Sequence, residues 1–320
     1  MLRCNRDEVD IAGLFLKATS QIPRGMVSTY GDIAAALGDT VASRVVGEVL
    51  SHNERPIIIP CHRVVYSTGQ VGWYSGHGKG HERKVELLSS EGLEVEGGKV
   101  KDFERHRFRD FDIPPVLREL REEQDDIASQ VRVTDDYGRL HRVAGLDVSY
   151  KGERAYGAIS IMDWESGEVV EERTVCRRVR FPYIPTYLSY REIPAIRELV
   201  KEDRDIIYLI DGQGVLHPRG AGIASHIGVC LDIPTVGAAK SLLCGEVKDP
   251  DAERSPVLMN GANKGYVLRQ GRKATYVSTG HRVALDTAVV VCSRTLDRGI
   301  PSPLRRAHDL ASRARREAGD

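Results

Sequence analysis

The segment that most constrains the fold is residues 206–228, IIYLIDGQGVLHPRGAGIASHIG. The run from Ile206 to Ile210 is short, apolar and rich in β-branched residues, which predicts a buried strand. Asp211 follows this strand directly. Because an isolated buried charge is very costly, its carboxylate must be paired, hydrogen-bonded or bound to a metal. The glycines that come next let the backbone pass close to a ligand. The segment predicts a metal-assisted phosphate site, and the alternative is a tight strand-loop-helix turn capped by Asp211.

The length and charge of the chain limit the class of protein. At 320 residues it is long enough for two domains. Its 46 basic and 46 acidic side chains give a formal net charge of zero, so any nucleic-acid surface has to be local. No signal segment or membrane-length apolar run is visible, which predicts a cytoplasmic protein without a membrane partner. The six cysteines form no CxxC pair, which argues against a zinc cluster and fits a reducing compartment.

Three helical patterns follow one another near the N-terminus. Residues 9–20 predict a first helix, which Pro23 and Gly25 end. The segment 29–38, TYGDIAAALG, predicts a second helix, and 41–53, VASRVVGEVLSHN, a third. Two short helices joined by a tight turn indicate a helix-turn-helix. The pair serves either DNA binding or plain core packing, and the pattern alone does not decide between them.

A cysteine and a histidine stand side by side in residues 57–65, IIIPCHRVV. Cys61 follows a strand-like apolar run that ends at Pro60, and its neighbour is His62. A cysteine nucleophile reacts as its thiolate, which a neighbouring imidazole and backbone donors favour. The pattern therefore indicates a nucleophile, and the alternative is a buried structural cysteine.

Residues 69–92, GQVGWYSGHGKGHERKVELLSSEG, complete this pattern. Together with IPCHRVV they make residues 9–96 resemble the DNA-binding, active-site domain of O6-alkylguanine-DNA alkyltransferases. The resemblance implies that Cys61 accepts the alkyl group from the guanine oxygen as an irreversible thioether. It also implies that His62 acts as the base through a water molecule, and that Glu91 holds His62.

The same resemblance implies a set of DNA contacts. Arg44 fills the gap that the extruded nucleotide leaves, and Tyr30 crowds the 3′ phosphate. Asn53 braces the turn before the active-site strand, while Tyr74 and Ser75 line the alkyl pocket. Such contacts are needed because the target atom lies inside the base stack, and extruding the base costs a few kcal/mol. In this family the helix-turn-helix enters the minor groove, which suits inspection of damage rather than sequence.

One position departs from the family pattern. Trp73 stands where a small or amide residue is common, just before the pocket tyrosine. A bulky indole at this position narrows or reshapes the pocket. A sister group of alkyltransferase-like proteins lacks the cysteine and only binds lesions. Cys61 argues against that behaviour, although a binding module that recognises alkylguanine without reacting remains an alternative.

The second part of the chain begins after residues 101–115, where periodicity is lost and charges and prolines predict a linker. An amphipathic pattern at 117–131 predicts a helix. Three strands are predicted next, followed by strand-helix units, which favours an α/β sheet with mixed strand directions. The three strand segments are 142–150, 155–164 and 168–181.

Three acids, Asp147, Glu192 and Asp211, lie on separate predicted elements and can converge on one site when the chain folds. Taken singly, each is as readily a surface acid or a helix cap. Hard divalent ions take oxygen ligands, so the set indicates Mg²⁺ or Mn²⁺ rather than zinc.

Five motifs occur in order over residues 116–318 and resemble endonuclease V, a family with a ribonuclease H-like fold. Its members nick a strand at the second phosphodiester bond 3′ of a deaminated base, typically hypoxanthine, and need magnesium or manganese. The resemblance implies that Asp147 and Asp211 are the first metal ligands and that Glu192 completes the acidic site. The motifs are GLDVSY, FPYIPTYLSYRE, LIDGQGVLHPRGAGIASHIG, TVGAAKSLL and STGHRVALDTA.

This resemblance assigns further residues. Lys240 becomes a phosphate-side cation near the scissile bond, and His281 a histidine near the metals that positions water or the leaving group. His217 contacts DNA or is a structural partner of its loop. Tyr183 lies between two prolines, which stiffen its loop, so it is interpreted as a wedge that enters the base stack. The alternative for Tyr183 is a core tyrosine.

The sequence thus predicts a multidomain, bifunctional DNA-repair protein whose partner is damaged DNA carrying alkylated guanine or deaminated bases. Residues 1–100 are predicted as a mostly α domain with a helix-turn-helix, 101–115 as a linker, and 116–320 as an α/β ribonuclease H-like domain. Because some relatives of endonuclease V prefer inosine in RNA, an RNA substrate is the alternative for the second activity.

Overall fold

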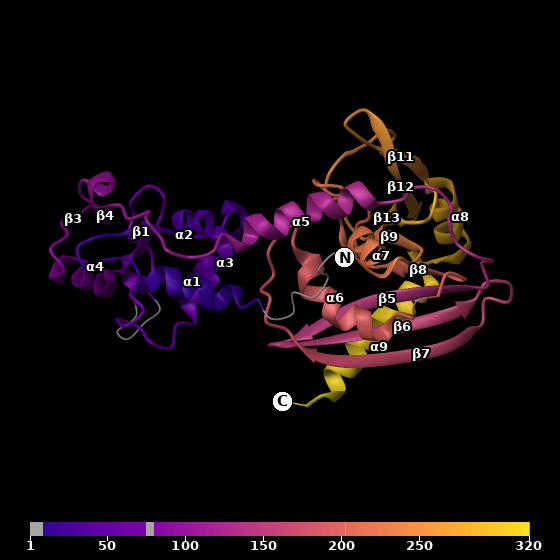
Figure 1. The fold of residues 1–320 in the computed structure, drawn as a ribbon, viewed down its shortest axis with the longest axis horizontal. Coiled ribbons are helices and arrows are strands. Elements are labelled where there is room, and N and C mark those ends of the chain that lie inside the picture. Colours follow the sequence, from indigo (N-terminus) through magenta and orange to yellow (C-terminus); the bar gives the residue numbers. More distant parts are fainter. Residues whose placement is uncertain (1–8, 75–79, 202, 320) are drawn as a thin grey trace. The chain divides into compact units, whose positions relative to one another are not determined.

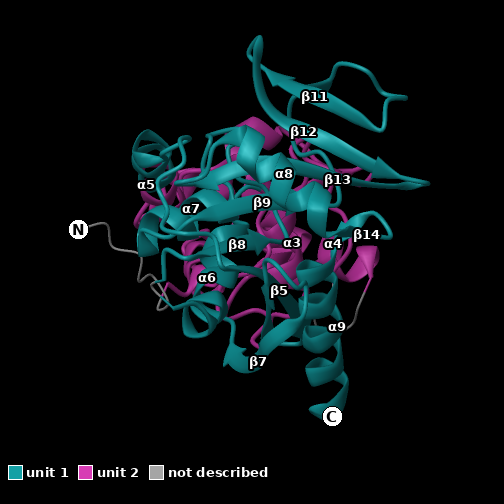
Figure 2. Ribbon diagram, turned by 90° about the vertical axis from the view of Figure 1, so that its right-hand side faces the viewer, with its two compact units in different colours: residues 1–7, 123–179, 186–320 teal, residues 8–122, 180–185 magenta. Residues whose placement is uncertain are grey.

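The computed structural model describes residues 9–74, 80–201 and 203–319. These residues divide into two compact units (Figure 2, magenta and teal). The N-terminal unit contains residues 9–122 and 180–185, and the C-terminal unit contains residues 123–179 and 186–319. No helix in the described ranges is long and apolar enough to cross a membrane.

The described part of the N-terminal unit is mostly helical (Figure 1). Its two strand pairs are only two residues long, and 3₁₀ turns connect several elements. The helices predicted at 9–20, 29–38 and 41–53 are confirmed, each within about two residues of its expected bounds. The elements are α1 Ile11–Ser20, β1 Ser28–Thr29, α2 Tyr30–Ala36, η1 Thr40–Ala42, α3 Ser43–Ser51, η2 Cys61–Arg63, β2 Val64–Val65, α4 His81–Ser90, β3 Val95–Glu96, β4 Lys99–Val100 and η3 Phe103–His106.

Helix α2 starts and stops where its sequence chemistry predicts. The Thr29 hydroxyl accepts a hydrogen bond from the Asp32 backbone N–H at 2.9 Å, and Asp32 Oδ2 accepts one from the Thr29 N–H at 3.2 Å. This capping box satisfies two N–H groups that the helix leaves open. At the other end, Gly38 has φ +106°, and a Cβ there would lie 2.5 Å from the Arg118 backbone nitrogen. Only glycine fits that position.

Residues 101–115, predicted as a linker, are hydrogen-bonded along the N-terminal unit. The N–H of Val27 donates to the carbonyl of His106 at 2.8 Å, and the N–H of Phe108 donates to the carbonyl of Val27 at 2.7 Å. Arg107 forms two hydrogen bonds of 2.8 Å with the carboxylate of Asp32. Bidentate pairs of this kind fix geometry as well as charge, so the segment is held along the N-terminal unit. The boundary between the units falls inside the next helix, α5 Val116–Gln130.

The C-terminal unit is built on a nine-stranded mixed sheet, in agreement with the α/β prediction. Strands β5, β6 and β7 form the predicted antiparallel meander, β8 pairs parallel to β5, and β9 pairs parallel to β8. The hairpin of β11 and β12 projects from the rest of the unit (Figure 2). The order is β10-β11-β12-β13-β9-β8-β5-β6-β7, with β5 Arg142–Lys151, β6 Arg154–Asp163, β7 Val169–Arg178, β8 Ile206–Ile210, β9 Thr235–Ala239, β10 Glu246–Val247, β11 Arg254–Met259, β12 Ala262–Gln270 and β13 Lys273–His281.

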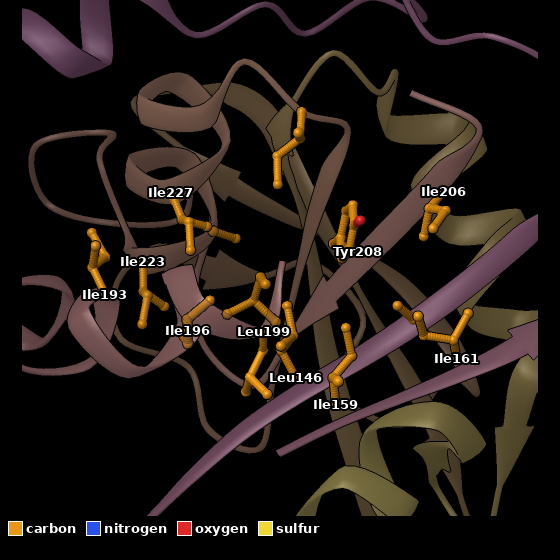
Figure 3. Close-up of a cluster of buried hydrophobic side chains, with 14 residues drawn as sticks. Leu146, Ile159, Ile161, Ile193, Ile196, Leu199, Ile206, Tyr208, Ile223 and Ile227 are labelled. Atoms are coloured by element: carbon orange, nitrogen blue, oxygen red, sulfur yellow. The ribbon is translucent and has the colours of Figure 1, made fainter. Parts of the chain in front are cut away.

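Helices cover both faces of this sheet because successive strand residues point to opposite sides. On one face, Leu146, Tyr208 and Ile210 pack with residues of α6 Leu188–Leu199 and α7 Ile223–Leu231 (Figure 3). On the other face, Val143 and Leu209 pack with residues of α8 Leu285–Thr295 and α9 Ser302–Glu317. A two-strand pair, β14 Leu296–Asp297 and β15 Ile300–Pro301, connects α8 to α9.

A single glycine lets α9 lie directly against β5. A Cβ on Gly145 would lie 2.2 Å from the carbonyl carbon of Pro303 and 2.3 Å from the backbone nitrogen of Leu304. Figure 1 shows α9 crossing the strands β5 to β7. Two residues along the strand from Gly145, on the same face, is Asp147. About one helical turn beyond Leu304 is His308, so the glycine contact sets these two side chains opposite each other.

We expect Gly145→Ala to destabilise the C-terminal unit by about 3 kcal/mol, because the new methyl group meets backbone atoms that cannot turn away. The measurement is urea unfolding followed by the fluorescence of Trp164, in a Trp73→Phe background so that one indole reports. Gly157→Ala is the matched control, since its Cβ would meet only side-chain carbons at 3.1 Å or more. Equal costs for the two substitutions would contradict the role given to the Gly145 contact.

Candidate active sites

Cys61 opens the 3₁₀ turn η2, directly after Pro60, and is 8% exposed. The side-chain amide of Asn53 donates to the carbonyl of Ile59 at 2.9 Å and to Cys61 Sγ at 3.4 Å. The backbone N–H of Arg55 donates to the amide oxygen of Asn53 at 3.0 Å. Asn53 therefore braces the turn before the cysteine and also gives the sulfur a hydrogen-bond donor.

His62 and Glu91 are in contact, as the sequence predicts. His62 Nε2 lies 3.1 Å from Glu91 Oε1, and Arg63 binds both oxygens of that carboxylate at 2.9 and 2.6 Å. Burial alone would raise the pKa of Glu91, but the hydrogen bonds from Arg63 and His62 outweigh it and lower the pKa. Burial lowers the pKa of His62, so the ring is neutral at neutral pH. Its Nδ1 is buried, without a hydrogen-bond partner among the described residues.

Further polar groups surround this pair. The ammonium group of Lys84 is buried and donates to the carbonyl of Val64 at 2.6 Å; burial lowers its pKa to about 8. Burial raises the pKa of Tyr30 to about 12, and nearby Tyr66 and Cys61 add to that shift. Burial also raises the pKa of Tyr74, whose ring meets the His62 ring edge to face. Both phenols are therefore protonated at neutral pH.

Of the two remaining predicted residues of this site, one is exposed and the other is not described. Arg44 is exposed in the first turn of α3. Ser75 falls outside the described residues. Sequence reasoning missed Lys84, because its pattern position on α4 resembles that of any surface lysine.

The structure brings two of the predicted acids together: Asp211 directly follows the carboxyl end of β8, and Asp147 lies in the middle of the neighbouring parallel strand β5. Leu146 pairs with Ile210 in the β5–β8 register, so the next residues, Asp147 and Asp211, lie opposite each other. Their side chains are 11% and 18% exposed. Glu192 enters from α6, where the Tyr150 hydroxyl donates to its Oε1 at 3.2 Å.

Burial and mutual repulsion control the charge of these acids. Burial raises the pKa of Glu192 to about 8, and the charge of Asp147 adds to the shift. Burial and then the charge of Asp211 raise the pKa of Asp147 above its ordinary value. Carboxylates crowded in this way are held ready for a cation, since a bound positive charge would favour their ionised forms.

Two basic side chains contact the acids. Lys240 Nζ lies 2.5 Å from Asp211 Oδ2, and this carboxylate raises the lysine pKa although burial alone would lower it. His308 Nδ1 lies 2.7 Å from Asp147 Oδ2. Asp147, Asp211 and His308 each offer one ligand atom, and these atoms lie within 4.8 Å of one another. Lys240 contacts one of the predicted acids, and its role beside the scissile phosphate stays a prediction. His308 was missed, because its position depends on the tertiary contact of α9 with Gly145.

His281 is not the histidine near the acids, which corrects the sequence prediction. It pairs with Thr235 at the amino end of β9, whereas Asp211 follows the carboxyl end of the parallel strand β8. Its Nδ1 accepts a hydrogen bond from the Arg132 N–H at 3.2 Å, and its Nε2 lies 3.4 Å from Asp232. The ring of His281 therefore belongs to an ion-pair network at the opposite end of the strands from Asp211.

His217 is also placed differently from the DNA contact predicted for it. It is 3% exposed, and its Nε2 lies 3.2 Å from the carbonyl of Thr186. Burial and the adjacent Arg219 charge lower its pKa to about 4, so the ring is neutral. These contacts match the structural alternative for His217. Gln124 and Arg219 both donate to the same Thr186 carbonyl, and Arg219 also donates to the side-chain oxygen of Gln124.

Tyr183 is 61% exposed, which excludes the core alternative for this residue. The rigid double-proline segment that holds it ends at Thr186, whose φ of +69° is rare for a β-branched residue. The hydrogen bonds from Gln124 and Arg219 to Thr186 compensate that strain.

The two sites define a protein with two active sites of different chemistry. One unit has a buried cysteine with a histidine–glutamate pair, and the other has an acidic cluster on an α/β sheet. The comparisons with known proteins agree. The endonuclease V model matches residues 125–309, and the 6-O-methylguanine DNA methyltransferase DNA-binding-domain model matches residues 13–93. The chain belongs to the bifunctional methyltransferase/endonuclease family.

Similar proteins of that description cover nearly the whole chain. The bifunctional methyltransferase/endonuclease of Picrophilus torridus is 38% identical over 308 residues, which are 96% of this chain and 98% of the relative. That of Thermoplasma volcanium is 38% identical over 310 residues, 97% and 92% of the two chains.

Solved structures of endonuclease V match the C-terminal part of the chain. Endonuclease V from Streptomyces avermitilis is 34% identical with a TM-score of 0.57, covering 62% of this chain and 93% of that one. The catalytic domain of human endonuclease V is 29% identical with a TM-score of 0.58, covering 65% and 98%. The C-terminal part has an endonuclease V-like fold, and the N-terminal part is an alkyltransferase-like domain.

Proposed function

We propose that the C-terminal unit nicks a DNA strand at the second phosphodiester bond 3′ of a deaminated base, with hypoxanthine as the main lesion. The observation that carries this proposal is the convergence of Asp147 and Asp211 from neighbouring strands, with Glu192 beside them and Lys240 against them. An acidic cluster with an adjacent cation suits an anionic backbone, because it holds a metal against the phosphate while the lysine balances charge.

The donor set fits a hard divalent ion, Mg²⁺ or Mn²⁺. Two carboxylates and one imidazole have ligand atoms within 4.8 Å of one another, and burial, followed by the charge of Asp147, raises the pKa of a third carboxylate, Glu192. Cysteine is absent from this set, and oxygen-rich donors favour magnesium or manganese over zinc. When bound, the ion activates water and stabilises the leaving oxygen. Asp147 and Asp211 would hold it, with Glu192 and His308 completing the site.

Other residues of the nuclease act on the DNA. Lys240 contacts the phosphate beside the scissile bond. Its raised pKa keeps its side chain positively charged for this contact. His308, held by Asp147, positions the reacting water or the ion. Tyr183 enters the stack as the wedge next to the lesion. Its exposure and its stiff loop support this role, since a side chain that is already ordered loses little freedom on insertion.

For the N-terminal unit we propose that Cys61 takes the alkyl group of O6-alkylguanine. A bond forms between Cys61 Sγ and the alkyl carbon as the O6–carbon bond breaks, and the guanine, which leaves as an anion, takes up one proton, equivalent to the one that the thiol releases. The thiol proton passes through a water molecule to His62 Nδ1, the buried ring atom without a described partner. Glu91 holds the opposite ring nitrogen and stabilises the imidazolium that forms.

The finer fold and domain assignments belong to the same proposal. We take α2 and α3 as the two helices of a helix-turn-helix, with Arg44 filling the gap, Tyr30 at the 3′ phosphate, and Tyr74 and Ser75 in the alkyl pocket. We assign residues 1–100 to the first domain together with the segment 101–115, because Arg107 binds Asp32, and residues 116–320 to a second, ribonuclease H-like domain. The parallel β5–β8 pair beside an antiparallel meander supports the last assignment.

One preparation tests both activities. Incubation with a duplex containing one hypoxanthine and Mg²⁺ should give a single nick with a 5′ phosphate, and EDTA should prevent it. Incubation with a duplex containing one O6-methylguanine should add one methyl mass to the Cys61 peptide. Faster cutting of a matched inosine-containing RNA would reassign the nuclease substrate, and binding without a mass increase would make the N-terminal unit a lesion-binding module.

A further inference from the structure

A recess of about 520 Å³ opens on the N-terminal unit. It lies between the start of α2, the first turn of α3 and the turn at residues 66–73. Neither Cys61 nor Tyr74 is among the described residues that line it, so it is distinct from the thiol site. The lining side chains that matter for its chemistry are Tyr30, Ser43, Arg44, Tyr66 and Trp73.

Two aromatic side chains of this recess are unusually open to solvent. Trp73 is 66% exposed and Tyr66 is 50% exposed. Large apolar surface that stays uncovered marks a place where a partner binds. The Tyr30 and Tyr66 ring centroids lie 5.9 Å apart with their planes at 50°, so the walls of the recess are aromatic faces and edges.

The backbone of the turn holds these rings in place. The Tyr66 N–H donates to the Gln70 carbonyl at 2.9 Å, and the Gly69 N–H donates to the Tyr66 carbonyl at 2.8 Å. Gly72 has φ +70°, and a Cβ there would lie 2.7 Å from the Tyr66 ring. The turn therefore keeps the Tyr66 ring packed on Gly72, next to Trp73, and a larger residue at 72 would push the ring away.

The lining fits a nucleobase of a nucleic-acid strand better than an isolated apolar molecule. Flat aromatic faces stack on any base, and the Arg44 guanidinium adds a cation. No carboxylate is found among the described lining residues, so nothing there repels a phosphate. Tyr30 is shared with the surroundings of Cys61, so the recess lies next to the place where the proposed reaction disturbs the strand.

We propose that this recess is a second base-binding subsite, in which Tyr66 and Trp73 stack on an unpaired base neighbouring the alkylated guanine. The subsite rests on the proposed alkyl transfer and extends it to a base that does not react. It gives the unusual tryptophan at position 73 a function: the indole holds the opened strand instead of shaping the alkyl pocket.

Two substrates separate this subsite from the alkyl pocket. A duplex with one O6-methylguanine needs both sites, whereas free O6-benzylguanine needs the alkyl pocket alone. We expect Trp73→Ala to slow transfer from the duplex about tenfold, the usual effect of losing one base–aromatic stack, and to leave transfer from the free base unchanged. Trp73→Phe, which keeps a flat ring, should retain most of the duplex rate. Equal losses on the two substrates, or no loss on either, would refute the subsite.

A binding measurement gives a second readout. In a Cys61→Ser, Trp164→Phe protein, Trp73 is the remaining tryptophan, because the chain has two. Its fluorescence should be quenched by the methylated duplex and unchanged by free O6-benzylguanine; quenching by both or by neither overturns the proposal. If the unaltered protein transfers no alkyl group from either substrate, the proposed alkyl transfer itself fails, which is a different result.

Discussion

Asp211→Asn is expected to reduce strand nicking at hypoxanthine by at least about a thousandfold, while alkyl transfer to Cys61 stays unchanged. The amide keeps the size of the side chain but removes the charge that holds a divalent ion opposite Asp147. Losing one ligand of such an ion costs several kcal/mol of transition-state stabilisation, and about 4 kcal/mol is a factor of a thousand. The measurement is the single-turnover nicking rate at saturating Mg²⁺, with the mass of the Cys61 peptide followed in parallel.

The folded state should tolerate this substitution. Asp211 raises the pKa of Asp147 by repulsion, which the neutral amide relieves, and the ion pair that it loses is with the half-exposed Lys240. The thermal midpoint should therefore not fall. Asp251→Asn, at an exposed turn outside the cluster, is the control and should nick at the normal rate. A nicking rate within tenfold of normal in the Asp211 variant would remove this acid from the metal site.

The meeting of Asp147 with Asp211 could be predicted because each follows from a local pattern. A short β-branched run indicates a strand; Asp211 directly follows one such strand, and Asp147 lies within another. The register confirms this, since Leu146 and Ile210 are partners. The third acid, Glu192, required the family resemblance, because its helix carries a charged pattern like that of many surface helices.

The histidines could not be assigned in this way. His281 lies at the end of an antiparallel strand. The sequence does not show whether the end of such a strand lies beside the carboxyl ends or the amino ends of the parallel strands. His308 depends on a tertiary contact, the close approach of α9 to Gly145, which no local pattern reports. The helix carrying it is amphipathic and arginine-rich, so its charged face is readily interpreted as solvated.

The contacts of residues 101–115 could not be predicted from the sequence either. Charged residues without periodicity predict a linker, yet Arg107 finds Asp32 at the start of α2, 75 positions earlier. The pairing satisfies a partly buried carboxylate that also caps a helix, which makes the segment part of the N-terminal unit. Composition and periodicity show that a segment lacks a regular helix or strand pattern. They do not show which distant side chain the segment binds in the folded protein.

Cys61→Ser is expected to abolish alkyl transfer and to leave nicking at hypoxanthine unchanged. A serine hydroxyl in the same turn accepts the Asn53 amide hydrogen bond, so the local structure should persist. Its oxygen is far less acidic and less nucleophilic than sulfur, and His62, whose pKa burial lowers, is too weak a base to generate an alkoxide. Intact mass after incubation with O6-methylguanine DNA should therefore show no added methyl group.

Cys176→Ser is the matched control, because the thiol of Cys176 is exposed. If exposure decided reactivity, the Cys176 variant would lose methylation and the Cys61 variant would keep it. A methyl group on Cys176, or on residue 61 of the serine variant, would show that the buried turn with Asn53, His62 and Glu91 does not select the acceptor.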